Sequence, residues 1–203
     1  MKQQSRLRFF IALLLLACSS VFAAQSAADR PVLNFSFLRG RVFLKSGSES
    51  LYALTMGKTG IVNGASVLTF ADGIAVISVA EHTELRMRED STMAFPASNS
   101  YELRKGMIGI KHSGPISQLA TPHVMTDFTE TLAVIKCTPV LTRICVIKGS
   151  MNVWQGRNLE KITLRAGQEI AAGQGRLSQP YPFTDDLRYA WYWTEPEKEP
   201  SLQ

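Results

Sequence analysis

The sequence predicts an all-β protein in which many short strands form a solenoid-like or sandwich-like domain. Short runs that are rich in β-branched residues, or that alternate between apolar and polar residues, recur along the chain, as in Ile74–Val79 and Thr131–Lys136. Turn-forming pairs such as Asn63–Gly64 and Asp72–Gly73 separate these runs at short intervals. Helical periodicity of useful length is missing before Asp185–Trp193, where we expect a short C-terminal helix.

The strands are expected in runs separated by turns, and Pro96, Pro115 and Gly149 are expected to mark some of these turns. The predicted strands, in chain order, are Val32–Leu38, Val42–Leu44, Ser66–Phe70, Ile74–Val79, Glu84–Arg88, Gly106–Lys111, Thr131–Lys136, Ile144–Lys148, Met151–Trp154 and Ile162–Leu164.

A weak internal repeat follows the order apolar, charged, Gly and then alternating apolar residues. It recurs around Gly40, Gly106, Gly149 and Gly167. A glycine in this place can supply a positive φ or a close backbone approach. The repeat fits stacked β-hairpin units that share one core, and it fits equally well the ordinary turns of any all-β protein.

The N-terminus has the features of a secretory signal peptide. Lys2, Arg6 and Arg8 precede the apolar run Phe9–Ala17, and small residues end at Ala23. The apolar run falls short of the roughly 20 residues that span a bilayer, which disfavours a transmembrane anchor. We therefore expect export and cleavage after Ala23, with the mature protein in the bacterial periplasm.

Lipidation is a second outcome for the same segment. Leu15–Cys18 has the outline of a lipobox, in which the cysteine becomes the acylated first residue. Acylation of Cys18 would tether the same domain to a membrane without changing its chemistry.

The net charge does not indicate nucleic-acid binding. The formal charge of the whole chain is +5, and three of its cations lie in the leader, so about +2 remains for the mature domain. The mature chain has no dense Lys/Arg run and no known nucleic-acid motif. We expect no nucleic-acid partner.

An ordered series of mostly glycine-containing motifs covers roughly Phe35–Gly175. The motifs are Gly40–Val42, Met56–Gly64, Ser66–Thr69, Ala71–Gly73, Ala75–Val79, His82–Leu85, Leu103–Gly106, Ala120–Pro122, Cys137–Thr138, Val146–Gly149 and Leu164–Gly167. In the order of these motifs the chain resembles the FecR domain family of periplasmic sensor modules.

The resemblance implies an all-β domain that acts by protein contact. In the best-known members the domain follows a transmembrane helix and a cytoplasmic segment that controls a sigma factor, and it receives a signal from an outer-membrane receptor. This sequence departs from that plan: it shows no cytoplasmic N-terminal segment, no convincing anchor, and no βαβ region after Gly175. Carrying over sigma-factor control is therefore unsafe.

We expect a non-catalytic periplasmic binding or scaffold module whose partner is an envelope protein or a cell-wall component. Membrane association would require lipidation or an uncleaved leader. The alternatives are a small-ligand sensor and an anti-sigma-type signalling regulator that an uncleaved leader holds at the membrane.

Two cysteines depart from the family pattern. Cys137–Thr138 stands where the family commonly has Gly-Thr, and Cys145 follows it. In an oxidising compartment an isolated pair of cysteines normally closes, so we expect a structural disulfide between Cys137 and Cys145 across a hairpin. The short loop would give a stabilisation of about 2–3 kcal/mol. A redox-active pair would favour Cys-x-x-Cys beside a helix start and is not expected.

No constellation of residues points to catalysis, a metal or a cofactor. His82, His112 and His123 have no zinc-site spacing. Alternating charges around Glu84 and Arg86 fit the solvent face of a strand. No Gly-x-Ser-x-Gly elbow and no phosphate-binding glycine loop is present. We expect a protein that is not an enzyme.

The C-terminal tail begins with the extended connector Gln179–Phe183, in which two prolines restrict the backbone. Its aromatic residues are Tyr189, Trp191, Tyr192 and Trp193. They either close an open edge of the β-domain or anchor an interface with a partner. The expected organisation is a signal peptide at 1–23, a connector at 24–34, a FecR-like domain at 35–178, and a tail at 179–203 with a short helix and a disordered end.

Overall fold

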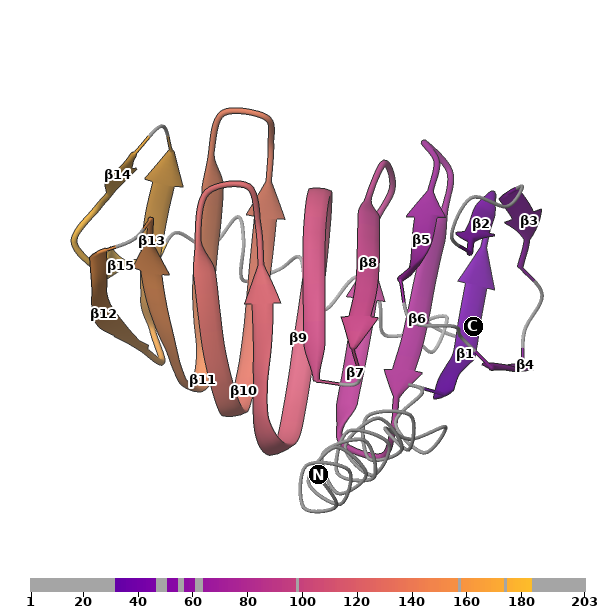
Figure 1. The fold of residues 1–203 in the computed structure, drawn as a ribbon, viewed down its shortest axis with the longest axis horizontal. Helices are drawn as coiled ribbons and strands as arrows, with labels where there is room; N and C mark the ends of the chain where they lie inside the picture. The colour runs from indigo at the N-terminus through magenta and orange to yellow at the C-terminus, as the bar shows by residue number, and fades with distance from the viewer. Residues whose placement is uncertain are drawn as a thin grey trace, which may run out of the picture.

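The structure, a computed structural model, describes residues 32–46, 51–54, 57–60, 64–97, 99–156, 158–173 and 175–183. Every element in these ranges is a β-strand, and the strands pair antiparallel (Figure 1). The all-β prediction is confirmed. Among the described residues there is no helix with the length and apolarity needed to cross a bilayer. The expected signal peptide and C-terminal helix lie outside the described residues.

The strands follow one another along the chain with short connections. They are β1 (Val32–Arg39), β2 (Val42–Lys45), β3 (Leu51–Ala53), β4 (Gly57–Gly60), β5 (Ala65–Thr69), β6 (Ile74–Val79), β7 (Thr83–Met87), β8 (Thr92–Ala97), β9 (Ser100–Ala120), β10 (Met125–Cys137), β11 (Thr142–Gln155), β12 (Asn158–Arg165), β13 (Gln168–Gly173), β14 (Arg176–Leu177) and β15 (Tyr181–Pro182).

The long strands β9 and β11 change partners along their length, while β10 pairs with both of them throughout, and this divides the sheet into two layers. The first layer has the order β14-β13-β11-β10-β9-β7-β6-β1-β4. The start of β9, up to Lys105, instead pairs with β8, which continues through β5 and β2 to β3. The end of β11 likewise leaves β13 and pairs with β12. In Figure 1, β8 overlaps β7 along the line of sight, as this arrangement requires.

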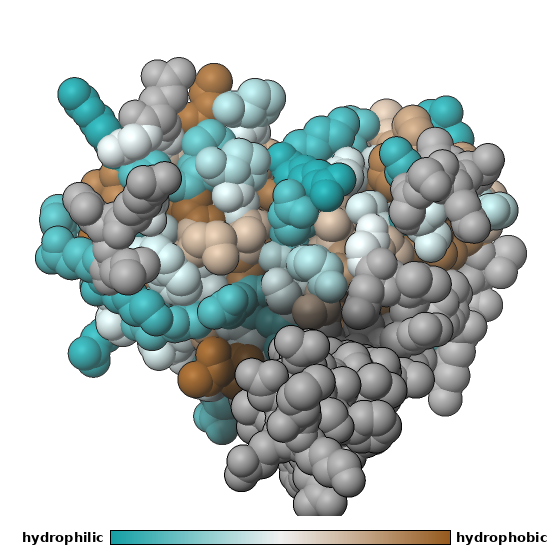
Figure 2. Space-filling view, viewed as in Figure 1, coloured by the Kyte–Doolittle hydropathy of each residue, from teal (hydrophilic) through white to brown (hydrophobic). Residues whose placement is uncertain are grey.

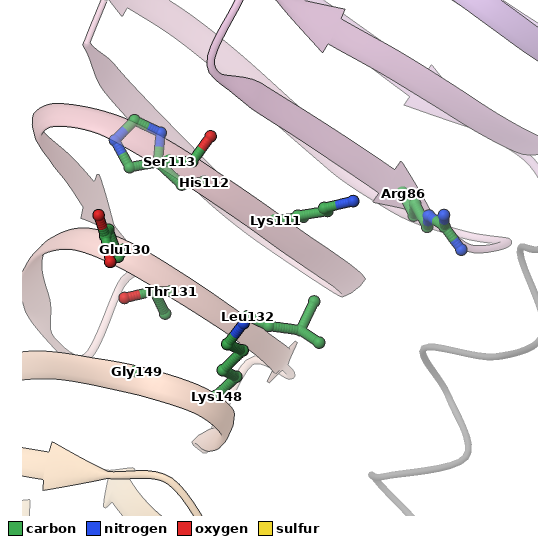
Figure 3. Close-up of a pocket in the computed structure, with 9 residues that line it drawn as sticks. All are labelled: Arg86, Lys111, His112, Ser113, Glu130, Thr131, Leu132, Lys148 and Gly149. Carbon is green, nitrogen blue, oxygen red and sulfur yellow. The ribbon is translucent and has the colours of Figure 1, made fainter.

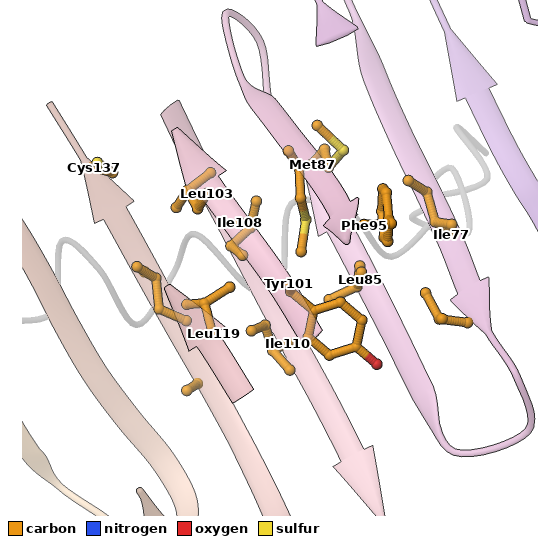
Figure 4. Close-up of a cluster of buried hydrophobic side chains, with 14 of the residues drawn as sticks. Ile77, Leu85, Met87, Phe95, Tyr101, Leu103, Ile108, Ile110, Leu119 and Cys137 are labelled. Atoms are coloured by element: carbon orange, nitrogen blue, oxygen red, sulfur yellow. The ribbon is translucent and has the colours of Figure 1, made fainter. Parts of the chain in front are cut away.

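The core lies between the two layers. On β7, Thr83, Leu85 and Met87 are buried while Glu84 and Arg86 between them are only half-buried, because successive side chains of a strand point to opposite faces. Inward-facing side chains of both layers join one cluster, part of which Figure 4 shows. Each large apolar side chain that is fully buried contributes about 1.5–3 kcal/mol. The architecture is therefore sandwich-like.

The motif glycines sit at the bends of the sheet. Gly40, Gly106, Gly149 and Gly167 all have positive φ. At Gly149 a Cβ would stand 1.8 Å from the backbone oxygen of Glu130, so the two strands can approach only without a side chain there. The predicted need for glycine at these positions is confirmed.

The predicted breaks at Gly149, Pro96 and Pro115 are wrong. β11 runs through Gly149 as one strand, which bends there rather than ending. Pro115 lies within β9, and Pro96 lies within β8 beside an irregularity in the pairing between Ala94 and Ala97. A missing backbone N–H is tolerated at such irregularities. Proline and glycine thus mark changes of strand direction in this fold.

No disulfide joins Cys137 and Cys145, and this prediction is corrected by the structure. The hairpin between β10 and β11 pairs Cys137 with Thr142 and Val134 with Cys145. The two cysteines are thus three steps apart along the ladder, and an odd offset places them on opposite faces. Cys137 points into the main core (Figure 4), while Cys145 packs with Val134 on the outer face.

Reducing agent is therefore expected to leave the stability of the protein unchanged. A closed disulfide would have contributed about 2–3 kcal/mol, and its reduction would lower the denaturation midpoint. Urea unfolding curves with and without dithiothreitol check this. Alkylation of the unfolded, unreduced chain followed by peptide mapping should label both Cys137 and Cys145; a protected, linked peptide pair would contradict the prediction.

Candidate functional site

The three histidines do not converge. His82 is exposed in the turn before β7, His112 is buried in β9, and His123 lies after β9 with its Nδ1 2.8 Å from Thr142 Oγ1. Within the described ranges, no group of three or more His, Cys, Asp or Glu residues could hold a metal ion.

His112 belongs to a hydrogen-bonded chain inside the core. Its Nε2 lies 2.8 Å from the carbonyl oxygen of Pro115, and its Nδ1 lies 2.7 Å from Thr83 Oγ1. Because a carbonyl only accepts, Nε2 carries the proton and Nδ1 accepts from Thr83. The Thr83 hydroxyl then accepts from the Tyr101 phenol at 3.1 Å. Both ring nitrogens are satisfied, which gives His112 a structural role.

Burial raises the pKa of the Tyr101 phenol above its usual value, and the neighbouring Thr83 and Ser117 hydroxyls oppose that rise. The folded state therefore favours the protonated phenol. This contribution to stability is fully present below the unfolded pKa of about 10 and is lost as pH rises through the higher folded pKa.

Tyr101→Phe should therefore be less stable than the unaltered protein near pH 7, by about 1 kcal/mol for the lost hydrogen bond. The difference should shrink as pH rises above about 10, because only the unaltered protein has this proton to lose. Urea unfolding of both proteins between pH 7 and 11 measures it. A difference that stays constant with pH would contradict the prediction.

A shallow groove of about 480 Å³ on the outer face of the first layer is the main candidate site. Lys111 of β9 pairs with Leu132 of β10, and Leu132 pairs with Lys148 of β11, so these side chains share one row on one face. Arg86 of β7 adds a third cation. The close-up in Figure 3 shows Arg86, Lys111 and Lys148 around this space, with Glu130 at its far end. The remaining lining residues are His112, Ser113, Thr131 and Gly149.

The groove has an excess of positive charge. Arg86 pairs with Glu84 at 2.6 Å and is half-buried. Lys111 and Lys148 are exposed, and neither has an ion-pair partner among the residues that the structure describes. With Glu130 as the acidic residue of the lining, the groove suits an anionic group or an acidic peptide segment.

An apolar patch on the same outer face borders the groove. Val134 and Cys145 form its buried centre, and Leu132, which also lines the groove, packs against them. Phe183, the last described residue, packs on the same centre. The other two members are Met107 and Ile147.

A buried ion pair holds the C-terminal segment on this face. Glu169 is fully buried, and its Oε1 accepts from Arg143 Nε at 2.5 Å and from the Tyr181 hydroxyl at 2.9 Å. β15 pairs with β13, and the Phe183 N–H donates to the Gly167 carbonyl at 3.2 Å. The described chain therefore ends beside the groove.

Two further hollows of about 450 and 340 Å³ lie on the described surface, the first lined by residues that include Thr163 and Arg165 and the second by residues that include Glu160 and Gln179, and both are more open than the groove. Figure 2 shows a mixed surface on the viewed face, where polar residues predominate and apolar residues lie in separate patches. Large apolar side chains that stand exposed are Tyr52, Phe70, Ile116, Met125 and Val140. Isolated residues of this kind are normal on a soluble protein surface.

The predicted lipidation site Cys18 and the predicted interface residues Tyr189, Trp191, Tyr192 and Trp193 lie outside the described residues. Lys111 and Lys148 were not predicted as site residues from the sequence. Each lies at an outward-facing position of a predicted strand, but only the order of the strands in the sheet brings the two lysines close to each other.

No family model and no curated protein matches the sequence. Two crystal structures of a protein from Parabacteroides distasonis ATCC 8503, named a "putative anti-sigma factor", share the fold. One has a TM-score of 0.54 at 11% identity, covering 63% of this chain and 64% of the other. The second has a TM-score of 0.52 at 11% identity, covering 62% of each chain. The match spans less than two thirds of those proteins, and at this identity the likeness concerns the fold alone.

Proposed function

We propose that this chain is a FecR-like module of the bacterial cell envelope that binds another envelope protein or a cell-wall component without catalysing a reaction. The observation that supports the proposal is the fold shared with the Parabacteroides distasonis structures. The FecR resemblance of the sequence implies a domain of this fold class that acts by protein contact.

The surface that the module would offer is the groove lined by Arg86, Lys111 and Lys148. It combines charge with the adjacent apolar side chain of Leu132, and protein interfaces use such a mixture of a polar rim and an apolar centre. A segment that carries carboxylates and an apolar anchor has the matching chemistry.

Site-specific photo-crosslinking in cells tests the proposal. A photoactivatable residue at Ser113, which is exposed in the groove lining, should give a discrete adduct with an envelope component. The double variant Lys111→Glu/Lys148→Glu should abolish the adduct, while the same probe at the exposed Tyr52 should not form it. An adduct that persists in the double variant, or none at all, would count against the groove as the binding surface.

The second candidate is an anti-sigma-type regulator that an uncleaved leader holds at the membrane, and the name of the structural neighbours favours it. Intact mass of the protein isolated from cell envelopes separates the forms. Loss of residues 1–23 supports the periplasmic module, an acylated Cys18 supports a tethered one, and the full-length mass supports the membrane-held regulator.

A further inference from the structure

The described chain ends in contact with the groove's own apolar border. Phe183 packs on Val134 and Cys145, and Leu132 belongs both to that cluster and to the groove. Leu132 lies two residues from Val134 on β10, and Lys111 and Lys148 flank Leu132 on the neighbouring strands. Because an extended chain advances about 3.3 Å per residue, a few residues after Phe183 are enough to reach the two lysines.

The sequence that continues from this point is complementary to the groove in charge. Residues 184–203 contain the carboxylates of Asp185, Asp186, Glu195, Glu197 and Glu199 against the cations of Arg188 and Lys198. The groove has an excess of positive charge, because two of its lysines are exposed and lack an ion-pair partner within the described part of the chain.

The same segment is complementary in its apolar residues. Tyr189, Trp191, Tyr192 and Trp193 stand between the two acidic groups of the tail. Leu132, Met107 and Ile147 are only partly buried around the point where Phe183 packs, so they offer an apolar surface to aromatic rings.

We propose that residues 184–203 bind the Arg86–Lys111–Lys148 groove of their own chain. The Glu169 ion pair and the packing of Phe183 hold the start of the segment in place, so the segment meets the groove at the high effective concentration of an intramolecular contact. The tail is then an autoinhibitory strap, and a partner with an acidic and aromatic segment must displace it. This inference rests on the proposed function and deepens it by naming the regulation of the same groove.

Tryptophan fluorescence of the purified full chain tests the contact without any partner, so its failure is distinct from a failure of the proposed function. The chain has three tryptophans, and Trp154→Phe leaves Trp191 and Trp193 as reporters. In this background Lys111→Glu/Lys148→Glu should increase acrylamide quenching at least twofold and shift the emission to longer wavelength. Further substitution of Glu195→Lys and Glu197→Lys should reverse both changes.

The matched control is Lys45→Glu/Lys105→Glu, which makes the same change in charge at exposed lysines outside the groove lining. It should leave quenching unchanged, and unfolding midpoints verify that all variants fold. Equal quenching in the groove and control variants would overturn the proposal. Quenching that depends on protein concentration would also overturn it, because the contact would then join two copies.

Discussion

Gly149→Ala is expected to lower the free energy of unfolding by more than about 3 kcal/mol. A non-glycine residue at a φ of 79° costs about 1–2 kcal/mol by itself. The added Cβ would also stand 1.8 Å from the Glu130 carbonyl oxygen, which belongs to the backbone of β10 and cannot rotate away. The strands must separate where β11 bends between the two layers, so the loss exceeds the conformational cost alone.

Gly167→Ala is the matched control. Its φ of 83° is nearly the same, and a Cβ there would meet nothing within 4 Å. This variant should lose only about 1–2 kcal/mol. Urea unfolding of the two variants and the unaltered protein measures both values. Equal losses would show that the close approach of Gly149 to Glu130 does not limit stability.

Arg143→Met is expected to destabilise the protein by about 3 kcal/mol. Removing one partner of a buried ion pair leaves the other charge without compensation. Glu169 is sensitive to this loss because none of its side chain reaches solvent, and its Oε2 already lacks a hydrogen-bond partner among the described residues. The Tyr181 hydroxyl alone would then stabilise the carboxylate.

The double variant Arg143→Met/Glu169→Leu distinguishes the free-energy cost of an unpaired buried carboxylate from the cost of lost side-chain packing. It removes the unpaired carboxylate together with its partner, so it should recover at least half of the lost stability, because apolar replacements of a buried pair are often neutral. Unfolding free energies of the single and double variants provide the comparison. A double variant less stable than Arg143→Met would show that Glu169 stabilises the fold through something other than its pairing with Arg143.

The local elements were largely predictable because their signals are local. The apolar run in Thr131–Lys136 lies in the second half of β10 (Met125–Cys137), and the β-branched run Ile74–Val79 coincides with β6. β8 was not predicted, because Pro96 is typical of a turn. The proline is tolerated within β8 because the pairing of β8 with β9 is irregular there, and the sequence of β8 alone does not reveal that pairing. The break expected at Gly149 failed for a similar reason: positive φ was predictable, but continuation of β11 beyond it depends on the change of partner from β13 to β12.

The cysteine prediction failed because it took account of chemistry and sequence separation but not of register. The pairing of Val134 with Cys145 assigns the two thiols to opposite faces, and a shift of one residue would have reversed this. His112 depends on the tertiary structure in the same way. Its partner Thr83 comes from β7, and Tyr101, which donates to Thr83, comes from a separate part of β9, so no pattern in the residues around His112 could identify either of them.

The sequence by itself determined that the chain is all-β and that glycines recur at its turning points, since alternation and backbone freedom are properties of single segments. The tertiary structure alone decided how the strands divide into two layers, where the thiols face, and that Arg86, Lys111 and Lys148 line one groove. These features depend on strand order and register, which arise from contacts between residues far apart in the chain. The residue pattern within one segment therefore does not determine strand order or register.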